Sequence, residues 1–434
     1  MEYKPVTAVW EITMGCNMRC KHCGSSCEKP LEDELSTEEA FKLSDDLGKL
    51  GLKWITLSGG EPTTRKDFYL IAKRLNENNI IPTLITNGWL LDENIVDKAI
   101  IGGINTIAIS IDGLEKTHDN MRKKGSFQRD MKALDLLGRK NIPSSVITTI
   151  NNINIKELEQ LKDILIEKGV VSWQLQLALP MGNMSKNSDL VVQPFQVDKV
   201  IDFAYRTTME NKIVIQLADC MGYFNMKEAS VRKHSSNIDG YTWTGCSAGK
   251  YTLGILNNGD IVGCTSVRDK TLVEGNIRTA SLEDIWENPD NFSWNRGMKK
   301  EKLQGTCGKC KYGNICLGGC SNTKLTHGGS LYAENKYCSY NFALSKAKNQ
   351  LDKVHSIEQL ISKGKKFIES GNLQLGEMAL SRAFDMGSKD EEMLEAYAYA
   401  NYMLENYTYA KNAYEKLLSI NPENKNAQRF YNLI

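Results

Sequence analysis

Three cysteines near the N-terminus could hold a metal centre. Cys16, Cys20 and Cys23 have three and then two residues between them and directly follow the strand-like run 9–13. Three thiolates on one loop can bind three irons of a cubic [4Fe–4S] cluster, whereas most ferredoxin-type clusters take four cysteines. The fourth iron is then free to bind another molecule. The alternative is a zinc knuckle, in which Cys27 or His22 would supply the fourth ligand.

A second set of seven cysteines lies between residues 246 and 338. The set consists of Cys246, Cys264, Cys307, Cys310, Cys316, Cys320 and Cys338, with Gly259 before the second cysteine. A Cys-x2-Cys pair alone is equally typical of a zinc ribbon. Two cysteines, Cys27 and Cys220, belong to neither set, and a small buried thiol is the commoner fate of such residues.

The first cysteine loop, with the ring residue His22 before its last cysteine, resembles the signature of the radical S-adenosylmethionine (SAM) superfamily. The resemblance implies that the free iron chelates the amino and carboxylate groups of SAM. One electron from the cluster then cleaves the sulfonium and gives a 5′-deoxyadenosyl radical. It further implies an oxygen-sensitive protein with an electron donor such as flavodoxin or ferredoxin.

The run Gly59-Gly60-Glu61-Pro62 resembles the GGEP motif of that family, in which a backbone carbonyl receives the SAM ammonium. Glycines let a ligand approach the backbone closely, although an ordinary turn after a strand also uses them. Arg122 is assigned to the SAM carboxylate or to substrate, with a surface ion pair as the alternative. By the same resemblance, the other SAM-binding candidates are His22, Asn87, Ser110 and Asp112.

The second cysteine set resembles the seven-cysteine SPASM pattern, which holds one or two auxiliary [4Fe–4S] clusters. The resemblance implies one fully ligated cluster on Cys307, Cys310, Cys316 and Cys338. A second cluster would lie on Cys246, Cys264 and Cys320. Residues 247–263 lack the further cysteine that fully ligated relatives carry. This second cluster is therefore open, or is completed by Cys220, Cys27 or a non-cysteine group.

Alternating strand and helix patterns must position these loops. We expect strands over 7–13, 54–58, 81–86, 104–111, 144–150 and 172–179. We expect helices over 37–50, 67–78, 92–101, 127–140 and 155–168, the first with a capping box from Ser36 and Glu39. Such a series predicts an α/β fold with a parallel sheet, here a partial (β/α)6 TIM-like barrel. Active sites of such barrels lie at the carboxyl ends of the strands, where the cysteine loop follows the first strand.

After Cys338 the chain becomes helical, and residues 345–434 match themselves at a spacing of 34 residues. Gly364, Gly376 and Leu380 correspond to Ala398, Ala410 and Tyr414. This pattern resembles tetratricopeptide (TPR) repeats, which bind partner peptides, although a purely structural cap fits the pattern too. We therefore predict a radical SAM domain over 1–215, a SPASM domain over 216–344 and an all-α TPR-like module over 345–434.

Composition excludes several classes of function. The 434 residues carry a formal net charge of +1, which gives no reason to expect nucleic acid or a membrane surface as partner. No run of 18 apolar residues and no signal peptide is evident, so we expect a cytoplasmic protein. Twelve cysteines are then metal ligands or thiols rather than disulfides.

The two resemblances together favour a radical SAM/SPASM oxidoreductase that modifies a ribosomally made peptide or a protein, for example by thioether or carbon–carbon crosslinks. No catalytic residue is assigned. With Cys16 so near the start there is no room for an N-terminal peptide-binding domain, so a separate protein, the TPR-like module or the barrel mouth must recognise the substrate. The alternatives are a sulfatase-maturing enzyme, a cofactor-biosynthetic enzyme with a small substrate, and a non-catalytic TPR adaptor with structural metal sites. Thr265 weakens the first, because that family places an aspartate after the second SPASM cysteine.

Overall fold

A twisted, mostly parallel sheet forms the centre of the N-terminal part of the chain. The computed structural model describes residues 3–236 and 243–434. Within them the sheet has the order β10-β9-β8-β1-β2-β3-β4-β5-β6-β7, and every pair from β8 to β7 is parallel. The strands are β1 (Thr7–Thr13), β2 (Trp54–Gly59), β3 (Ile81–Thr86), β4 (Ile107–Ser110), β5 (Ser144–Ile150), β6 (Ser172–Leu177), β7 (Val214–Leu217), β8 (Thr252–Ile255), β9 (Asp260–Val262) and β10 (Val273–Asn276).

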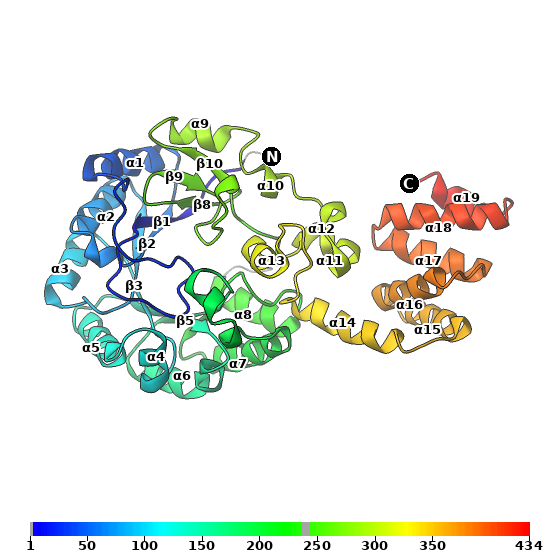
Figure 1. The fold of residues 1–434 in the computed structure, drawn as a ribbon, viewed down its shortest axis with the longest axis horizontal. Helices are drawn as coiled ribbons and strands as arrows, with labels where there is room; N and C mark the ends of the chain where they lie inside the picture. The colour runs from blue at the N-terminus through cyan, green and yellow to red at the C-terminus, as the bar shows by residue number, and fades with distance from the viewer. Residues whose placement is uncertain (1–2, 237–242) are drawn as a thin grey trace.

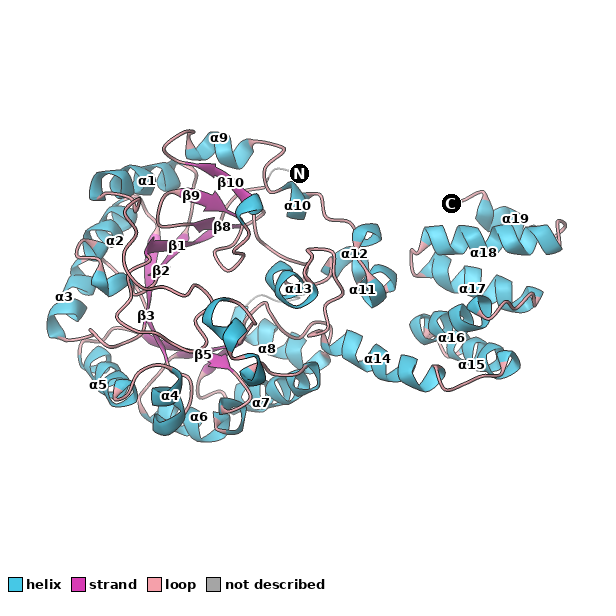
Figure 2. Ribbon diagram, in the orientation of Figure 1, coloured by secondary structure: helices cyan, strands magenta, loops and turns pink. Residues whose placement is uncertain are grey.

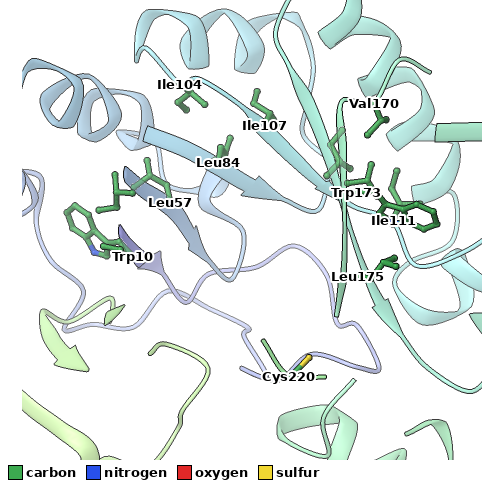
Figure 3. Packing of buried hydrophobic residues seen from close by; sticks show 14 of the residues in the cluster. Trp10, Leu57, Leu84, Ile104, Ile107, Ile111, Val170, Trp173, Leu175 and Cys220 are labelled. Carbon is green, nitrogen blue, oxygen red and sulfur yellow. The ribbon is translucent and has the colours of Figure 1, made fainter. Parts of the chain in front are cut away.

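Helices cover the outer face of this sheet, and the strands line the inside (Figure 2). They are α1 (Thr37–Lys49), α2 (Phe68–Glu77), α3 (Glu93–Ile101), α4 (Glu115–Met121), α5 (Ser126–Arg139), α6 (Leu158–Glu167) and α7 (Val197–Glu210). Apolar side chains from successive strands, including Trp10, Leu57, Leu84 and Trp173, pack in one buried cluster (Figure 3). Burial of these side chains stabilises the barrel.

The predicted α/β fold with a parallel sheet is confirmed. All six predicted strands are present, but the run predicted over 104–111 is a strand only from Ile107 to Ser110, and the helix over Glu115–Met121 was not predicted. The parallel series also continues into β7, which spans the boundary predicted at residue 215. On the other side β8 pairs with β1, so the auxiliary region closes an edge that would otherwise remain open.

The cysteine-rich region forms short helices around the open side of the barrel. After the β8–β9–β10 hairpins, α13 lies at the barrel mouth and α14 leads away from it (Figure 1). The helices of this region are α8 (Met226–Ser236), α9 (Leu282–Glu287), α10 (Ser293–Arg296), α11 (Gly305–Lys309), α12 (Gly313–Cys316), α13 (Ser321–Gly328) and α14 (Ser339–Leu351).

Residues 345–434, called the helical module below, form two helical hairpins and a last short helix beyond α14. The helices are α15 (Ile357–Glu369), α16 (Leu373–Asp385), α17 (Glu391–Met403), α18 (Tyr407–Ile420) and α19 (Lys425–Tyr431). The second hairpin begins 34 residues after the first, as the self-match predicts. Small residues are needed where the helices cross: a Cβ on Gly376 would lie 2.5 Å from Ile368. In the described part of the chain, no helix is both long and apolar enough to cross a membrane.

Candidate functional site

The loop that carries Cys16, Cys20 and Cys23 lies across the carboxyl ends of the strands. The backbone of Gly60 donates to Thr13 O at 2.7 Å, and the backbone of Glu61 donates to Gly15 O at 2.8 Å. A Cβ on Gly60 would lie 2.3 Å from Gly15 O, so only glycine allows this approach. The glycines of the GGEP run therefore fix the start of the cysteine loop against the end of β2.

The carboxylate of Glu61 is an anchor between strand ends. It is fully buried and accepts hydrogen bonds from Thr63 (N at 3.1 Å and Oγ1 at 2.5 Å), Thr86 Oγ1 at 2.8 Å and Asn87 N at 2.6 Å. Burial raises the pKa of Glu61, and these donors oppose the rise. Two residues of the predicted SAM-binding run are therefore placed. The Glu61 side chain connects the end of β2 to the end of β3, and Pro62 is buried at the start of the turn that follows β2.

A buried network of charged side chains contacts His22 in the cysteine loop. Asp112 Oδ2 lies 2.5 Å from Arg122 Nε and 3.1 Å from His22 Nε2, and all three side chains are buried. Burial alone would raise the pKa of Asp112, but Arg122 and His22 outweigh it and hold that pKa below its usual value. Arg122 is only 8% exposed, so the surface ion pair considered for it is wrong. The network fixes the orientation of His22 beside Cys20 and Cys23.

The thiols of the loop have donors next to them. Asn87 Nδ2 lies 3.9 Å from Cys16 Sγ, and Arg122 Nη1 lies 4.0 Å from Cys20 Sγ. A hydrogen bond from the Cys27 thiol lowers the pKa of Cys23, with further help from neighbouring backbone amides. Donors and a cation of this kind stabilise thiolates, the form in which cysteine binds metal. Burial outweighs them at Cys16 and Cys20 and raises the pKa of both thiols, that of Cys20 to about 11, so a bound metal is needed to hold these two sulfurs deprotonated. Cys27 therefore lies at this loop and not with the second cysteine set.

Other strand ends complete the surroundings of the loop. Lys21 N donates to Met121 O at 2.9 Å, and Asn183 N, from the turn after β6, donates to Cys23 O at 2.8 Å. Ser110 is half-buried at the end of β4. The structure therefore brings the three cysteines, His22, Asn87, Asp112 and Arg122 together at one end of the barrel.

Two buried atoms of the cysteine loop fit a bound polar ligand. His22 Nδ1 and Asn17 Nδ2 have no protein partner, as expected where a polar ligand is to be bound. In the described residues, no three His, Cys, Asp or Glu side chains converge on a single-ion site.

Four of the seven later cysteines surround one small cavity. Cys307, Cys310, Cys316 and Cys338 line it together with apolar and aromatic side chains. Burial raises the pKa of Cys307 to about 11 and the pKa of Cys316 to about 12. Neighbouring thiolates add to both shifts, so a cation is needed to hold these sulfurs deprotonated. These are the four residues that the SPASM resemblance assigns to one cluster.

Of the remaining three cysteines, Cys320 packs against both the barrel core and the aromatic cluster that contains Cys316. Burial raises the pKa of Cys320, and the charges of Cys246, Cys220 and Cys264 raise it further, so each of these three thiols lies close enough to Cys320 to act on its charge. The Cys220 sulfur also accepts a hydrogen bond from Leu177 N at 3.2 Å. Of the two unassigned cysteines, Cys220 is thus the one that lies with this set (Figure 3 shows it at the open end of the barrel).

Comparisons with known proteins agree with this arrangement. Residues 10–165 match the family described as the radical SAM superfamily, and residues 246–311 match the iron–sulfur cluster-binding SPASM domain. The AdoMet-dependent heme synthase of Methanosarcina barkeri is 30% identical over 349 residues, which cover 78% of this chain and 98% of that protein. The chain belongs to the radical SAM superfamily.

Two further proteins resemble this chain, one in sequence and one in fold. The mycofactocin maturase MftC of Mycolicibacterium smegmatis is 23% identical, over 77% of this chain and 82% of that protein. The crystal structure of Streptococcus suis SuiB bound to S-adenosylmethionine superposes with a TM-score of 0.63 at 16% identity, covering 78% of each chain. At that identity the likeness shows a shared fold.

Membership of this superfamily settles the class of protein and its cofactors. The chain is an enzyme that uses SAM and [4Fe–4S] clusters, with a SPASM domain after the radical SAM domain. The non-catalytic adaptor considered from the sequence is therefore wrong. Sequence reasoning also missed the buried residues Glu11, His118 and Asp130, because none of them belongs to a recognisable motif. Only the apolar setting of Glu11 within its strand could have marked it.

Proposed function

We propose that this radical SAM/SPASM enzyme modifies a peptide or protein by abstracting a hydrogen atom from one of its carbons. Cys16, Cys20 and Cys23 hold the cluster whose open iron binds SAM, and this cluster supplies the electron that cleaves SAM. Flavodoxin or ferredoxin delivers that electron. The geometry in support is the single loop that holds three donor-assisted thiols beside unpartnered buried polar atoms at the barrel mouth.

The residues around the loop bind and orient SAM. Asn87, from the end of β3, and Ser110, from the end of β4, offer polar groups near the cysteines. Arg122 keeps a guanidinium fixed by Asp112 and faces the loop, where it can pair with a carboxylate. His22 presents a ring with one free nitrogen. Gly59 and Gly60 contribute indirectly, because they let the backbone of the cysteine loop pack closely against the end of β2.

The auxiliary cysteines form two further sites. Cys307, Cys310, Cys316 and Cys338 hold a closed cluster that passes electrons. Cys246, Cys264 and Cys320 hold a second cluster nearer the barrel, where an open iron can bind a substrate thiolate. The cavity lined by four cysteines supports the first assignment. The effect of Cys246 and Cys264 on the pKa of Cys320 supports the second.

The helical module supports a peptide as substrate. A hollow of about 370 Å³ lies on it, lined by Ile368, Glu392, Glu395, Ala396, Tyr399, Tyr414, Asn426 and Phe430. Side chains from α15, α17, α18 and α19 contribute, so the hollow runs across both hairpins. Paired helices with a groove of aromatic and charged residues suit an extended peptide. We therefore assign substrate recognition to this face of a TPR-like module.

A small substrate is the second candidate, because three AdoMet-dependent heme synthases are among the relatives. The heme synthase of Methanosarcina barkeri is matched over 98% of its length. By that likeness the substrate would be a tetrapyrrole bound at the barrel mouth. We do not propose the sulfatase-maturing reaction, because Thr265 supplies no carboxylate where that family has its base.

One experiment separates these candidates. The anaerobically reconstituted enzyme, reduced and supplied with SAM, is incubated with peptides encoded beside its gene or with an iron coproporphyrin. The proposal predicts that a peptide changes mass while 5′-deoxyadenosine forms. A modified porphyrin with unchanged peptides would replace the peptide by the small substrate.

A further inference from the structure

The helical module contacts the loop that carries Cys307 and Cys310. In Figure 1 the module lies beside α11, which carries Cys307 and ends just before Cys310, and beside α12. The contacts come from Gln374, Glu377 and Ser381 on α16 and from the turn between α17 and α18. This contact face differs from the face that carries the 370 Å³ hollow, because the two sets share no residue.

Lys309, which stands between the two cysteines, reaches into the module. Its Nζ lies 3.2 Å from Glu377 Oε1, 3.4 Å from Ser381 Oγ and 4.0 Å from the ring centre of Tyr409. The Glu377 side chain is only 2% exposed. A carboxylate so deeply buried is retained in folded proteins when it has a charged partner, and here that partner belongs to the cysteine loop.

The backbone on both sides of Cys310 is held as well. Lys311 N donates to Gln374 Oε1 at 2.9 Å, and Asn406 Nδ2 donates to Lys309 O at 3.3 Å. Both module side chains are buried. Lys300, which is 2% exposed, donates from Nζ to Leu404 O at 2.5 Å. The module therefore fixes the position of Cys310 through polar contacts. A module that moved independently of the cysteine-rich region would not make them.

We propose that the helical module is part of the auxiliary redox centre, and that the Glu377–Lys309 pair positions the Cys307–Cys310 loop and sets the reduction potential of its cluster. The inference rests on the proposed function, because it takes Cys307, Cys310, Cys316 and Cys338 as the ligands. Reduction adds negative charge to a cluster, so a nearby cation favours the reduced form and a nearby carboxylate disfavours it. Lys309 and Glu377 therefore act in opposite directions.

The test is a redox titration of the full-length, reconstituted enzyme followed by electron paramagnetic resonance (EPR). The signal of this cluster is the one that Cys310→Ala removes. Four variants are compared: Glu377→Gln, Lys309→Met, the double variant, and Glu369→Gln. The last makes the same charge change at an exposed position of α15 and serves as the control.

The proposal predicts that Glu377→Gln raises the midpoint potential, Lys309→Met lowers it and the double variant returns towards the wild-type value, while Glu369→Gln leaves it unchanged. A second outcome would support the proposal equally well: Glu377→Gln loses the cluster, whereas the double variant, which removes both charges, keeps it. A wild-type enzyme with all its clusters and no change of potential in any variant overturns the inference. A wild-type enzyme that lacks the Cys310-dependent signal overturns the proposed ligation itself.

Discussion

Arg268 joins the auxiliary domain to the first strand of the barrel through Glu11. Arg268 Nη1 lies 2.9 Å from Glu11 Oε2, and a second guanidinium nitrogen contacts Glu11 and Ser25. Arg268 follows Cys264 by four residues, whereas Ser25 lies between Cys23 and Cys27. One guanidinium therefore connects the loop of an auxiliary cysteine with the loop that carries Cys16, Cys20 and Cys23.

Replacing Arg268 by Gln should destabilise the enzyme. The Glu11 side chain is 5% exposed, so the variant leaves a buried carboxylate without its cation. Breaking a buried pair costs about 3–5 kcal/mol, and the partial exposure of Arg268 reduces this to about 2–3 kcal/mol. Anaerobic urea denaturation measures the change in the free energy of unfolding. The double variant Glu11→Gln/Arg268→Gln should recover part of the loss; equal stability of Arg268→Gln and wild type would contradict the bridge.

Replacing Gly60 by Ala should disrupt the first cluster. The added Cβ would lie 2.3 Å from Gly15 O, so the start of the cysteine loop must move away from the GGEP turn. Iron should fall from about twelve to about eight per chain, since one cubane of three is lost. Gly138→Ala is the control, because nothing lies within 4 Å of its Cβ and it sits inside α5. Full iron in Gly60→Ala would show that the loop tolerates the displacement.

Acid should weaken the enzyme through His327. Burial, together with the charge of Lys336, lowers the pKa of His327 to about 4. The unfolded chain binds this proton near pH 6.5, so the unfolded state holds more protons between pH 6.5 and 4 and stability falls as the pH falls. His327→Phe keeps the ring that stacks on Tyr337 and removes the titration.

Between pH 7 and pH 5, the wild type should lose about 1–2 kcal/mol more than His327→Phe. Comparing urea denaturation of the two proteins at each pH isolates the imidazole, since acid effects on the clusters are common to both. Parallel pH profiles would exclude His327 as the source.

Much of the fold and of the candidate site could be predicted from the sequence, because the informative signals are local. The strand and helix patterns predicted six strands, and the resemblance to the SPASM pattern predicted which thiols line one cavity. The Glu11–Arg268 pair could not be predicted, since 257 residues separate its members and only the pairing of β8 with β1 brings them together. Likewise, helical periodicity predicted α16 but not that Glu377 on it is buried against Lys309.

The most direct test of the central claim is SAM cleavage by the anaerobically purified, reduced enzyme. The account predicts that SAM changes the EPR spectrum of the reduced protein and that 5′-deoxyadenosine forms. The variant Cys16→Ala/Cys20→Ala/Cys23→Ala should do neither, although it keeps about eight irons per chain. An unchanged spectrum and no 5′-deoxyadenosine from the fully loaded wild type would contradict an open iron at this loop.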